Sequence, residues 1–524
     1  CHVKRLIDQY DPILLVIVVT EWEDWASSFS NVDWLDIWNQ RCNNPGRRIG
    51  AFRVDDSRSL QAYLINEYLP LLEHAALYLS PVAPPDLRAI HAEVSGETIR
   101  RQIRYLGFVM DEYNMIWNSW HSLLNKPRVF SRPVLNTFKF DAPAVVCGSG
   151  PSLDGCIDLI RELSSSHLII ACASNYGTLR RAGIEVDILC LLERGDFMIE
   201  QYQQVVDNYG AGRTRLLASV TTPAEIQSLF TEPMIYFRPS LTPIALFADS
   251  PVQVLVNEGP QTINTGVALA SQIGCSRILL CGVDLGVASL ERVRSVDAIG
   301  DSPRDFTEKQ PGNLVETIYT NMALLDGKVV LEAMAPSYAD SGIELFNASN
   351  GLLIKGFEPI HPTAYRERFH PTQPSQQHFD EASERLWRWW HEQPRYQPDR
   401  FMAMWRASKP RERTHDLITA LIDCLRADEP WLPQTAIKLT RILKCENIQR
   451  SAQFGRRIIR GQILKLILSV TRQRIVMVGS PEQQDAFESK ARALIIDRLK
   501  SLEREIFSLL DHLEITAVSQ SISQ

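Results

Sequence analysis

A strand, turn and helix pattern near residue 150 combines the residue types that bind phosphate. The apolar run 144–147 predicts a buried strand, and Gly148, Ser149 and Gly150 interrupt it directly afterwards. Pro151 suits the first turn of a helix, where its missing N–H costs little. At the start of such a helix, unpaired backbone N–H groups and the helix dipole both favour an anion. The pattern predicts a phosphate site whose expected ligand is a nucleotide.

The same turn argues against a dinucleotide such as NAD. The dinucleotide fingerprint needs a third glycine, and Leu153 stands at that position. A Gly-x-Gly pair after a strand is a weak signal by itself, since many such turns bind nothing. We include Ser152 and Leu153 with the three small residues as candidate binding positions.

Elements around this turn alternate between strand and helix from residue 140 to residue 360, which predicts a mainly parallel sheet covered on both faces. Apolar runs predict strands at 144–147, 168–173, 187–192, 215–219, 234–238, 277–282 and 343–347. Helical periodicity predicts helices at 152–163, 176–182, 223–229, 262–273 and 313–327. Ligands of such sheets bind outside the carboxyl ends of the strands.

Small or polar residues follow five of these predicted strands, so they should gather at one edge of the sheet. Beyond the first turn they are Ser174 and Asn175, Glu193, Asp284, and Asn347 with Ser349. Hydroxyl and amide groups suit a ribose or a base edge, and Glu193 or Asp284 could accept from a sugar or act as a general base. Thr262 and Asn264 open another predicted helix, where they could cap it or contact a ligand.

Other chemistries fit the sequence poorly. It has no GxxxxGK[ST] loop, no GxSxG elbow and no HExxH motif. The central region has no DxD-like carboxylate pair for a metal–diphosphate clamp, so we expect no metal site and no cofactor. His167 precedes a predicted strand, which favours a structural role.

Composition limits the class of protein further. A net charge of −7 and a pI near 6.0 argue against a general nucleic-acid binder. Several of the ten cysteines lie in apolar strands, which indicates a reducing, cytoplasmic compartment. The run 13–19 is too short to span a bilayer and predicts a core strand. The chain begins with Cys1 rather than Met, so we expect its N-terminus to be incomplete.

The chain as a whole predicts an α/β fold with a central Rossmann-like sheet. We expect an N-terminal α/β domain (1–135), the central domain (136–360), a proline-rich linker (361–376) and a C-terminal helical domain (377–524). Within the first domain, 99–124 predicts a helix and 126–132 a connecting segment. In the last domain, 455–460 is basic and amphipathic; a solvated helix face is favoured there over a membrane or partner contact.

Five segments together resemble the motility associated factor (Maf) family of flagellin glycosyltransferases, whose central domain is shared with pterin pyrophosphokinase-like proteins. The segments are GSGPSLD (148–154), ASNYGTLRRAGIEVDILCLLE (173–193), GPQTINTGVALASQIGCSRILLCGVDLG (259–286), NLVETIYTNMALLDG (313–327) and FNASNGLLIKGFEPI (346–360). The resemblance covers about 220 central residues.

The resemblance implies a core similar to that of bacterial sialyltransferases and transfer of pseudaminic or legionaminic acid from a CMP-activated donor to Ser or Thr of flagellin. It places Gly148, Ser149, Gly150 and Ser152 at the CMP phosphate and ribose, and Ser174 and Asn175 at the ribose or cytosine. It also places Thr262, Asn264, Asp284, Asn347 and Ser349 in the donor pocket.

The general base stays open at this point, because sialyltransferases usually use a histidine and no histidine here follows a comparable predicted strand. Glu193, Asp284, Glu316 and His361 are the candidates. Two alternatives also remain, an ATP-dependent pterin pyrophosphokinase-like enzyme and a non-catalytic flagellin-binding factor.

Overall fold

The structure is a computed structural model whose contacts group the chain into two compact units. One unit is Cys1–Tyr113 with Met404–Ser519, and the other is Asn114–Ala403 with Gln520–Gln524. The structure describes residues 2–44, 47–76, 78–80, 83–94, 106–133, 138–239, 241–250, 252–300, 305–369, 376–444 and 453–522.

These units differ from the four segments expected from the sequence. Helix α16 (Gln376–Glu392) belongs to the central unit, because Phe379, Leu386 and Trp390 are buried in the same apolar cluster as strands of the central sheet. The expected linker 361–376 contains helix α15 (Pro362–Phe369), whose Tyr365 is fully buried.

The central unit is built on a nine-stranded sheet in which every pair of neighbouring strands is parallel. Its order is β13-β12-β9-β4-β5-β6-β7-β8-β3. In chain order the strands are β3 (Arg128–Val129), β4 (Ala144–Cys147), β5 (Leu168–Cys172), β6 (Ile188–Leu191), β7 (Arg215–Ser219), β8 (Met234–Tyr236), β9 (Arg277–Cys281), β12 (Glu344–Asn347) and β13 (Glu358–Pro359).

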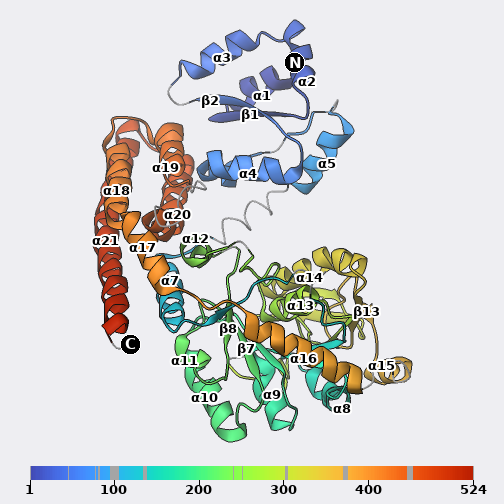
Figure 1. Cartoon of the computed structure of the whole chain (residues 1–524). Helices are drawn as coiled ribbons and strands as arrows, with labels where there is room; N and C mark the ends of the chain where they lie inside the picture. The colour runs from blue at the N-terminus through green and yellow to red at the C-terminus, as the bar shows by residue number, and fades with distance from the viewer. Residues whose placement is uncertain are drawn as a thin grey trace. The chain divides into compact units, whose positions relative to one another are not determined.

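Helices cover both faces of this sheet, as Figure 1 shows. Alternate residues of β4 enter different cores: Val146 packs with α13 (Thr262–Gln272), α14 (Met322–Asp340) and α16, and Val145 packs on the opposite face. The second face is covered by α8 (Leu153–Leu163), α9 (Tyr176–Arg181), α10 (Phe197–Tyr209) and α15. The short helices η3 (Ala173–Asn175), α11 (Ala224–Gln227) and α12 (Thr242–Phe247) complete the unit.

The predicted strands of the central region are confirmed, each to within two residues, because buried parallel strands read as continuous apolar runs. The predicted helix 313–327 is wrong. That stretch contains β11 (Thr317–Thr320), which pairs antiparallel with β10 (Glu308–Pro311), and α14 begins only after Asn321 caps it. The connecting segment 126–132 is also wrong, because β3 pairs there with β8.

The other unit combines the N-terminal part of the chain with most of its C-terminal helices. Its N-terminal part has two parallel strands, β1 (Leu14–Val19) and β2 (Arg48–Arg53), which confirms the predicted core strand. Helices accompany them: α1 (His2–Tyr10), α2 (Trp22–Ala26), η1 (Ser27–Ser30), α3 (Trp34–Cys42), α4 (Ser57–Tyr68), η2 (Leu69–His74) and α5 (Pro85–Glu93).

Its C-terminal part is helical, as predicted. The elements are α18 (Pro410–Arg426), η5 (Trp431–Thr435), α19 (Ala436–Ile442), α20 (Phe454–Val476) and α21 (Pro481–Ile522). The unit boundaries fall inside α7 (Val109–Leu124) and α17 (Pro398–Ala407). The described part of the predicted helix 99–124 starts at Val109, and residues 99–105 lie outside the described residues. No helix among the described residues has the length and apolar character needed to cross a membrane.

Candidate functional site

The strand order places a topological switch point between β4 and β9. After β4 the chain builds β5, β6, β7 and β8 on one side, then returns to β9 on the other side. Doubly wound folds bind their ligands outside the carboxyl edge of the sheet at such a switch point. The predicted phosphate turn follows β4, so it lies at this switch point.

The turn after β4 is fastened to the loop after β9 by backbone hydrogen bonds. Gly148 N donates to Cys281 O, and Gly150 N donates to Gly282 O, each at 2.8 Å. A Cβ on Gly148 would overlap the carbonyl oxygen of Gly282, and a Cβ on Gly150 would lie 2.6 Å from Asp284 Cβ. Both glycines are therefore needed for the close approach of the two loops.

A carboxylate of the chain itself occupies the first turn of α8. Ser152 N donates to Asp284 Oδ2 at 2.9 Å, and the Ser152 hydroxyl donates to Asp284 Oδ1. Asp284 is only 3% exposed, and burial raises its pKa to about 6, although the two bonds from Ser152 act to lower it. The expected contact between Ser152 and phosphate is therefore not available, because the backbone N–H and the hydroxyl of Ser152 both donate to Asp284.

This buried carboxylate predicts a pH dependence of stability. The pKa of Asp284 is higher in the folded protein than its ordinary value of 3.8, so folding takes up a proton between about pH 4 and pH 6. The contribution of Asp284 to the free energy of unfolding is therefore most favourable below pH 4, and it is about 3 kcal/mol smaller above pH 6.

Asp284→Asn should remove that decrease, so the variant should gain stability relative to the unaltered protein as the pH rises. Urea unfolding at several pH values measures the difference, with the exposed Asp196→Asn as the matched control. An Asp284→Asn curve parallel to that of the unaltered protein would contradict the assignment.

The end of β5 contributes one half-exposed side chain and one structural one. Asn175 is fully buried; its Oδ1 accepts from Cys172 N at 3.1 Å and its Nδ2 donates to Cys147 O. The expected contact of Asn175 with a ribose or base is therefore not available, because its amide ties β5 to β4. Ser174 is half-exposed, and its Oγ accepts from Arg294 Nη2 at 2.5 Å.

A loop that the sequence analysis missed brings two arginines to this edge. It follows β9, and Ser295 N donates to Ser149 O at 3.0 Å. Arg292 pairs with Asp154 in the first turn of α8, and Arg294 Nη1 donates to Ile299 O at 2.9 Å. Two guanidinium groups beside a small-residue turn suit a phosphate. Both arginines lie well beyond the end of β9, within its long following loop, so no local signal in the sequence marked them.

Glu193 is the accessible carboxylate of the edge. It follows β6, is half-exposed, and its Oε1 accepts from Thr262 Oγ1 at 2.9 Å. Thr262 begins α13, with Gln261 as the N-cap. Leu192 N donates to Glu193 Oε2 at 3.2 Å, so both carboxylate oxygens are oriented.

Tyr202 of α10 lies near Glu193 and was also missed. Its hydroxyl is fully buried, and no described residue bonds to it. Burial raises the pKa of Tyr202; the charge of Glu193 raises it further, and that of Arg294 lowers it. An unpaired buried hydroxyl next to Glu193 and Arg294 marks a place where a ligand group or a water must bond.

The end of β12 holds a set of buried amides. Asn347 Oδ1 accepts from Ser349 N at 3.0 Å, and Ser349 Oγ accepts from Val283 N at 2.8 Å. Asn313, which the sequence analysis did not name, donates through Nδ2 to the carbonyls of Asn347 and Ser349. Asn347 Nδ2, Asn313 Oδ1 and Asn350 Oδ1 are left buried without a partner among the described residues. These three atoms need a donor or acceptor from elsewhere.

Two further predicted positions, Asn264 and Leu153, have structural roles. Asn264 is buried; its Oδ1 accepts from Gln261 N and its Nδ2 donates to Gly327 O, each at 3.0 Å, so it caps α13 and binds α14. Leu153 is fully buried, and its N–H donates to Gly150 O at 3.0 Å. Neither side chain is therefore available for the direct contact with a ligand that the sequence predicted.

The remaining base candidates do not follow β4, β5, β6 or β9 directly. Glu316 is exposed beside β11, outside the nine-stranded sheet. His361 is exposed and follows β13, three strands from β4, and its Nδ1 lies 2.8 Å from Thr363 Oγ1. A histidine does therefore follow a strand of the sheet, contrary to the sequence analysis, which missed the two-residue β13.

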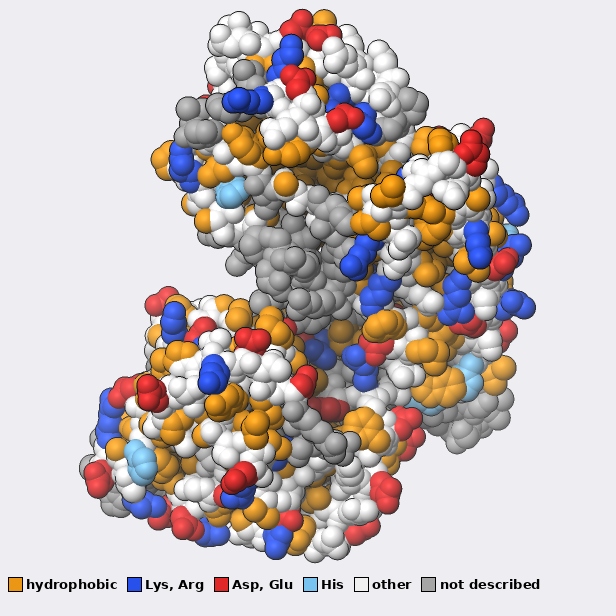
Figure 2. Space-filling view, turned by 180° about the vertical axis from the view of Figure 1, so that it is seen from behind, with side chains coloured by type: hydrophobic (Ala, Val, Ile, Leu, Met, Phe, Trp, Pro, Cys, Tyr) orange, Lys and Arg blue, Asp and Glu red, His pale blue; other side chains and the backbone are white. Residues whose placement is uncertain are grey.

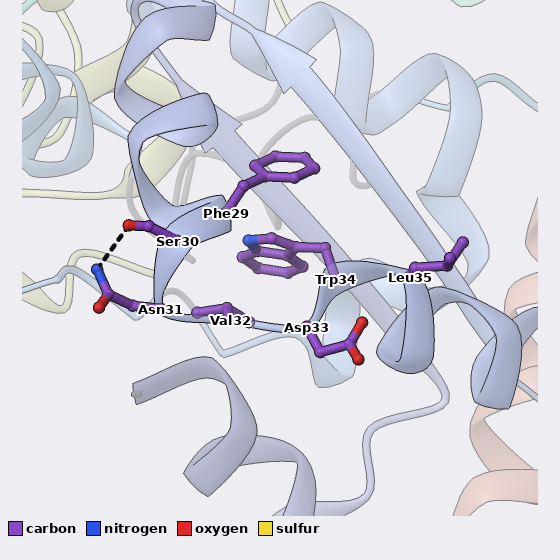
Figure 3. A pocket seen from close by; sticks show the side chains of 7 residues that line it. All are labelled: Phe29, Ser30, Asn31, Val32, Asp33, Trp34 and Leu35. Atoms are coloured by element: carbon purple, nitrogen blue, oxygen red, sulfur yellow. Dashed lines mark hydrogen bonds between the residues drawn. The ribbon is translucent and has the colours of Figure 1, made fainter.

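Figure 3 shows a surface hollow elsewhere, lined by Phe29, Ser30, Asn31, Val32, Asp33, Trp34 and Leu35. The carboxylate of Asp33 caps α3 there by accepting from Asp36 N at 2.9 Å. Asn31 donates to Ser30, and Trp34 Nε1 donates to Ser28 Oγ. Its polar groups are therefore mostly used in local structure. Across the described residues, no group of three His, Cys, Asp or Glu side chains could hold a metal ion.

The comparison of this chain with known proteins first identifies a class for its central domain. Residues 121–289 match the model of a family described as 6-hydroxymethylpterin diphosphokinase MptE-like. This stretch runs from α7 through β9 to the loop that holds Asp284, so it contains the switch point. No curated protein matches the sequence.

A solved structure then resembles nearly the whole chain. It is the Maf glycosyltransferase from Magnetospirillum magneticum AMB-1, with a TM-score of 0.74 and 21% sequence identity. The match covers 97% of this chain and 77% of that one. The two proteins share a fold, and the likeness together with the MptE-like domain supports the resemblance to the Maf family.

Proposed function

We propose that this protein is a glycosyltransferase that moves a nonulosonic acid, pseudaminic or legionaminic acid, from its CMP-activated form to Ser or Thr of flagellin. The observation that supports it most is a small-residue turn with two arginines at the switch point, in a fold shared with a solved Maf glycosyltransferase. We further propose that it acts in the cytoplasm.

The edge of the sheet offers a path for the donor. The half-exposed Ser149 and the two arginines of the loop after β9 would hold its phosphate beside Gly150. Glu193 follows the second strand along from β4, about 10 Å away at the usual strand spacing. Ser174 lies between them, after β5. The sugar would extend from the phosphate towards Glu193.

Transfer requires that one bond breaks as another forms. The bond between the anomeric carbon and the phosphate oxygen breaks, CMP leaves with the electron pair, and the carbon develops oxocarbenium character. The guanidinium groups of Arg292 and Arg294 would stabilise the charge on departing CMP. The acceptor hydroxyl attacks the anomeric carbon and gives its proton to Glu193 Oε.

Glu193 suits the role of base better than the other candidates. It is half-exposed and oriented by Thr262, whereas Asp284 is buried and bound to Ser152. We propose that Asp284 is a positioning residue that holds the turn after β4 against the loop after β9.

The proposal is tested by incubating the protein with flagellin and either CMP-pseudaminic or CMP-legionaminic acid. Intact mass spectrometry should show flagellin heavier by one or more sugar residues with one of the donors. A repeat with a chelator should give the same result, since we expect no metal requirement. No added mass with either donor would count against the proposal.

The MptE-like match of residues 121–289 supports a second candidate, an ATP-dependent pterin pyrophosphokinase. Release of AMP from ATP that depends on added 6-hydroxymethylpterin would favour it. A non-catalytic flagellin-binding factor is the third alternative: CMP would bind without turnover, and Glu193→Ala with Asp284→Ala would leave flagellin modification unchanged.

A further inference from the structure

Helix α20 carries an unusual concentration of positive charge. Its sequence, FGRRIIRGQILKLILSVTRQRIV, contains six basic residues and no acidic one. Figure 2 shows Lys and Arg side chains on the surface of the C-terminal helices. Three of the six, Arg456, Arg457 and Arg460, lie in the first two turns of the helix.

The other basic residues of α20 have partners or are solvated. Arg474 Nε donates to Glu488 Oε1 at 2.6 Å, and Lys465 Nζ lies 3.3 Å from the centre of the Phe108 ring. Arg472 is exposed. The first three arginines are different: they are half-buried, and each has a buried Nε with no hydrogen-bond partner among the described residues.

The three arginines also lie at the end of the helix that favours the opposite charge. The N-terminus of a helix carries a partial positive charge, so cations there are unfavourable and an anion is favourable. Arg456 and Arg460 are four residues apart and share one face, which adds repulsion between like charges. A bound anion would offset both effects.

This part of α20 is held firmly by close packing on either side of the arginines. A Cβ on Gly455 would lie 2.6 Å from Thr414 Cγ2, and a Cβ on Gly461 would lie 2.8 Å from the carbonyl carbon of Gly107. The guanidinium groups therefore project from a fixed backbone, which favours forked recognition of carboxylates.

We propose that Arg456, Arg457 and Arg460 form a binding site for a short acidic segment of the acceptor polypeptide. The whole chain has a net charge of −7, which disfavours an extended polyanion such as a nucleic acid or an anionic membrane. Three clustered guanidinium groups instead match a few neighbouring carboxylates. That the bound polypeptide is the acceptor rests on the proposed function; the binding itself does not.

The test uses the full chain and a fluorescein-labelled hexaglutamate peptide. The unaltered protein should bind it, and Arg456→Gln with Arg460→Gln should weaken binding by about tenfold or more, since hydrogen bonds between charged groups are lost. Added salt should also weaken binding. Arg472→Gln, the matched control on the same helix, should leave binding unchanged.

Circular dichroism checks that the variants fold. Arg456→Lys is the milder variant, because it keeps the positive charge and loses the forked N–H donors of the guanidinium group. Absence of peptide binding, or an equal loss in Arg472→Gln, would overturn the proposal. So would binding to phosphatidylglycerol vesicles in place of the peptide. If glycosyl transfer fails but the peptide binds, only the proposed function is lost. If both hold, the double variant should raise KM for the acceptor and leave KM for the donor unchanged.

Discussion

Replacing Glu193 by Gln should lower the rate of sugar transfer by about 100- to 10,000-fold, the usual contribution of a general base. The amide can still accept from Thr262 Oγ1, so the loop after β6 should keep its position. KM for the donor should change little, because the phosphate is held by other groups. Steady-state kinetics with flagellin and the CMP-activated sugar measures both quantities.

Glu316→Gln is the control variant that distinguishes Glu193 from another carboxylate considered as the general base. Glu316 is exposed beside β11, outside the nine-stranded sheet, and has no part in the proposed mechanism, so its replacement should leave the rate near that of the unaltered protein. Full activity in Glu193→Gln would remove Glu193 from the mechanism.

Replacing Gly148 by Ala should destabilise the central unit by about 3 kcal/mol, the cost of a severe steric overlap in a packed interior. The new Cβ would overlap Gly282 O and lie 2.9 Å from Gly282 C and 3.0 Å from Val283 Cα. All of these atoms are backbone, so β4 and β9 would have to separate. Urea unfolding measures the loss, and activity should fall with it.

Gly155 offers the matched control for this substitution. It lies in α8, is exposed, and a Cβ there meets nothing within 4 Å. Gly155→Ala should therefore stabilise the protein by up to about 1 kcal/mol through helix propensity. Equal stabilities for the two variants would show that the turn after β4 tolerates a side chain and that its packing against β9 is loose.

The sequence predicted the sheet well because its strands are buried on both faces and appear as apolar runs. It failed where a short element carries few apolar residues: β10 and β11 form a hairpin of polar and β-branched residues, and β13 has only two residues. Elements this short contain too few apolar residues for their periodicity to be recognised, even though β10 pairs with the nearby β11 and β13 with the nearby β12.

The site was predicted in outline, and the partners of its side chains were not. Asn175 and Asn264 have the polar side chains expected of ligand contacts, yet both bind backbone groups inside the protein. Arg294 was missed because the long loop after β9 folds back onto Ser174, a contact between residues 120 positions apart. Only the fold shows which polar groups are already bonded and which are free to bind a ligand.

The proposed function depends most on where the phosphate of the donor binds. Crystals of the protein soaked with CMP test this directly. We expect the phosphate beside Ser149 and Gly150, within reach of Arg292 or Arg294, and the nucleoside along the carboxyl edge of the sheet. CMP bound away from the turn after β4 and the loop after β9 would contradict the proposed function, as would the absence of binding at millimolar concentration.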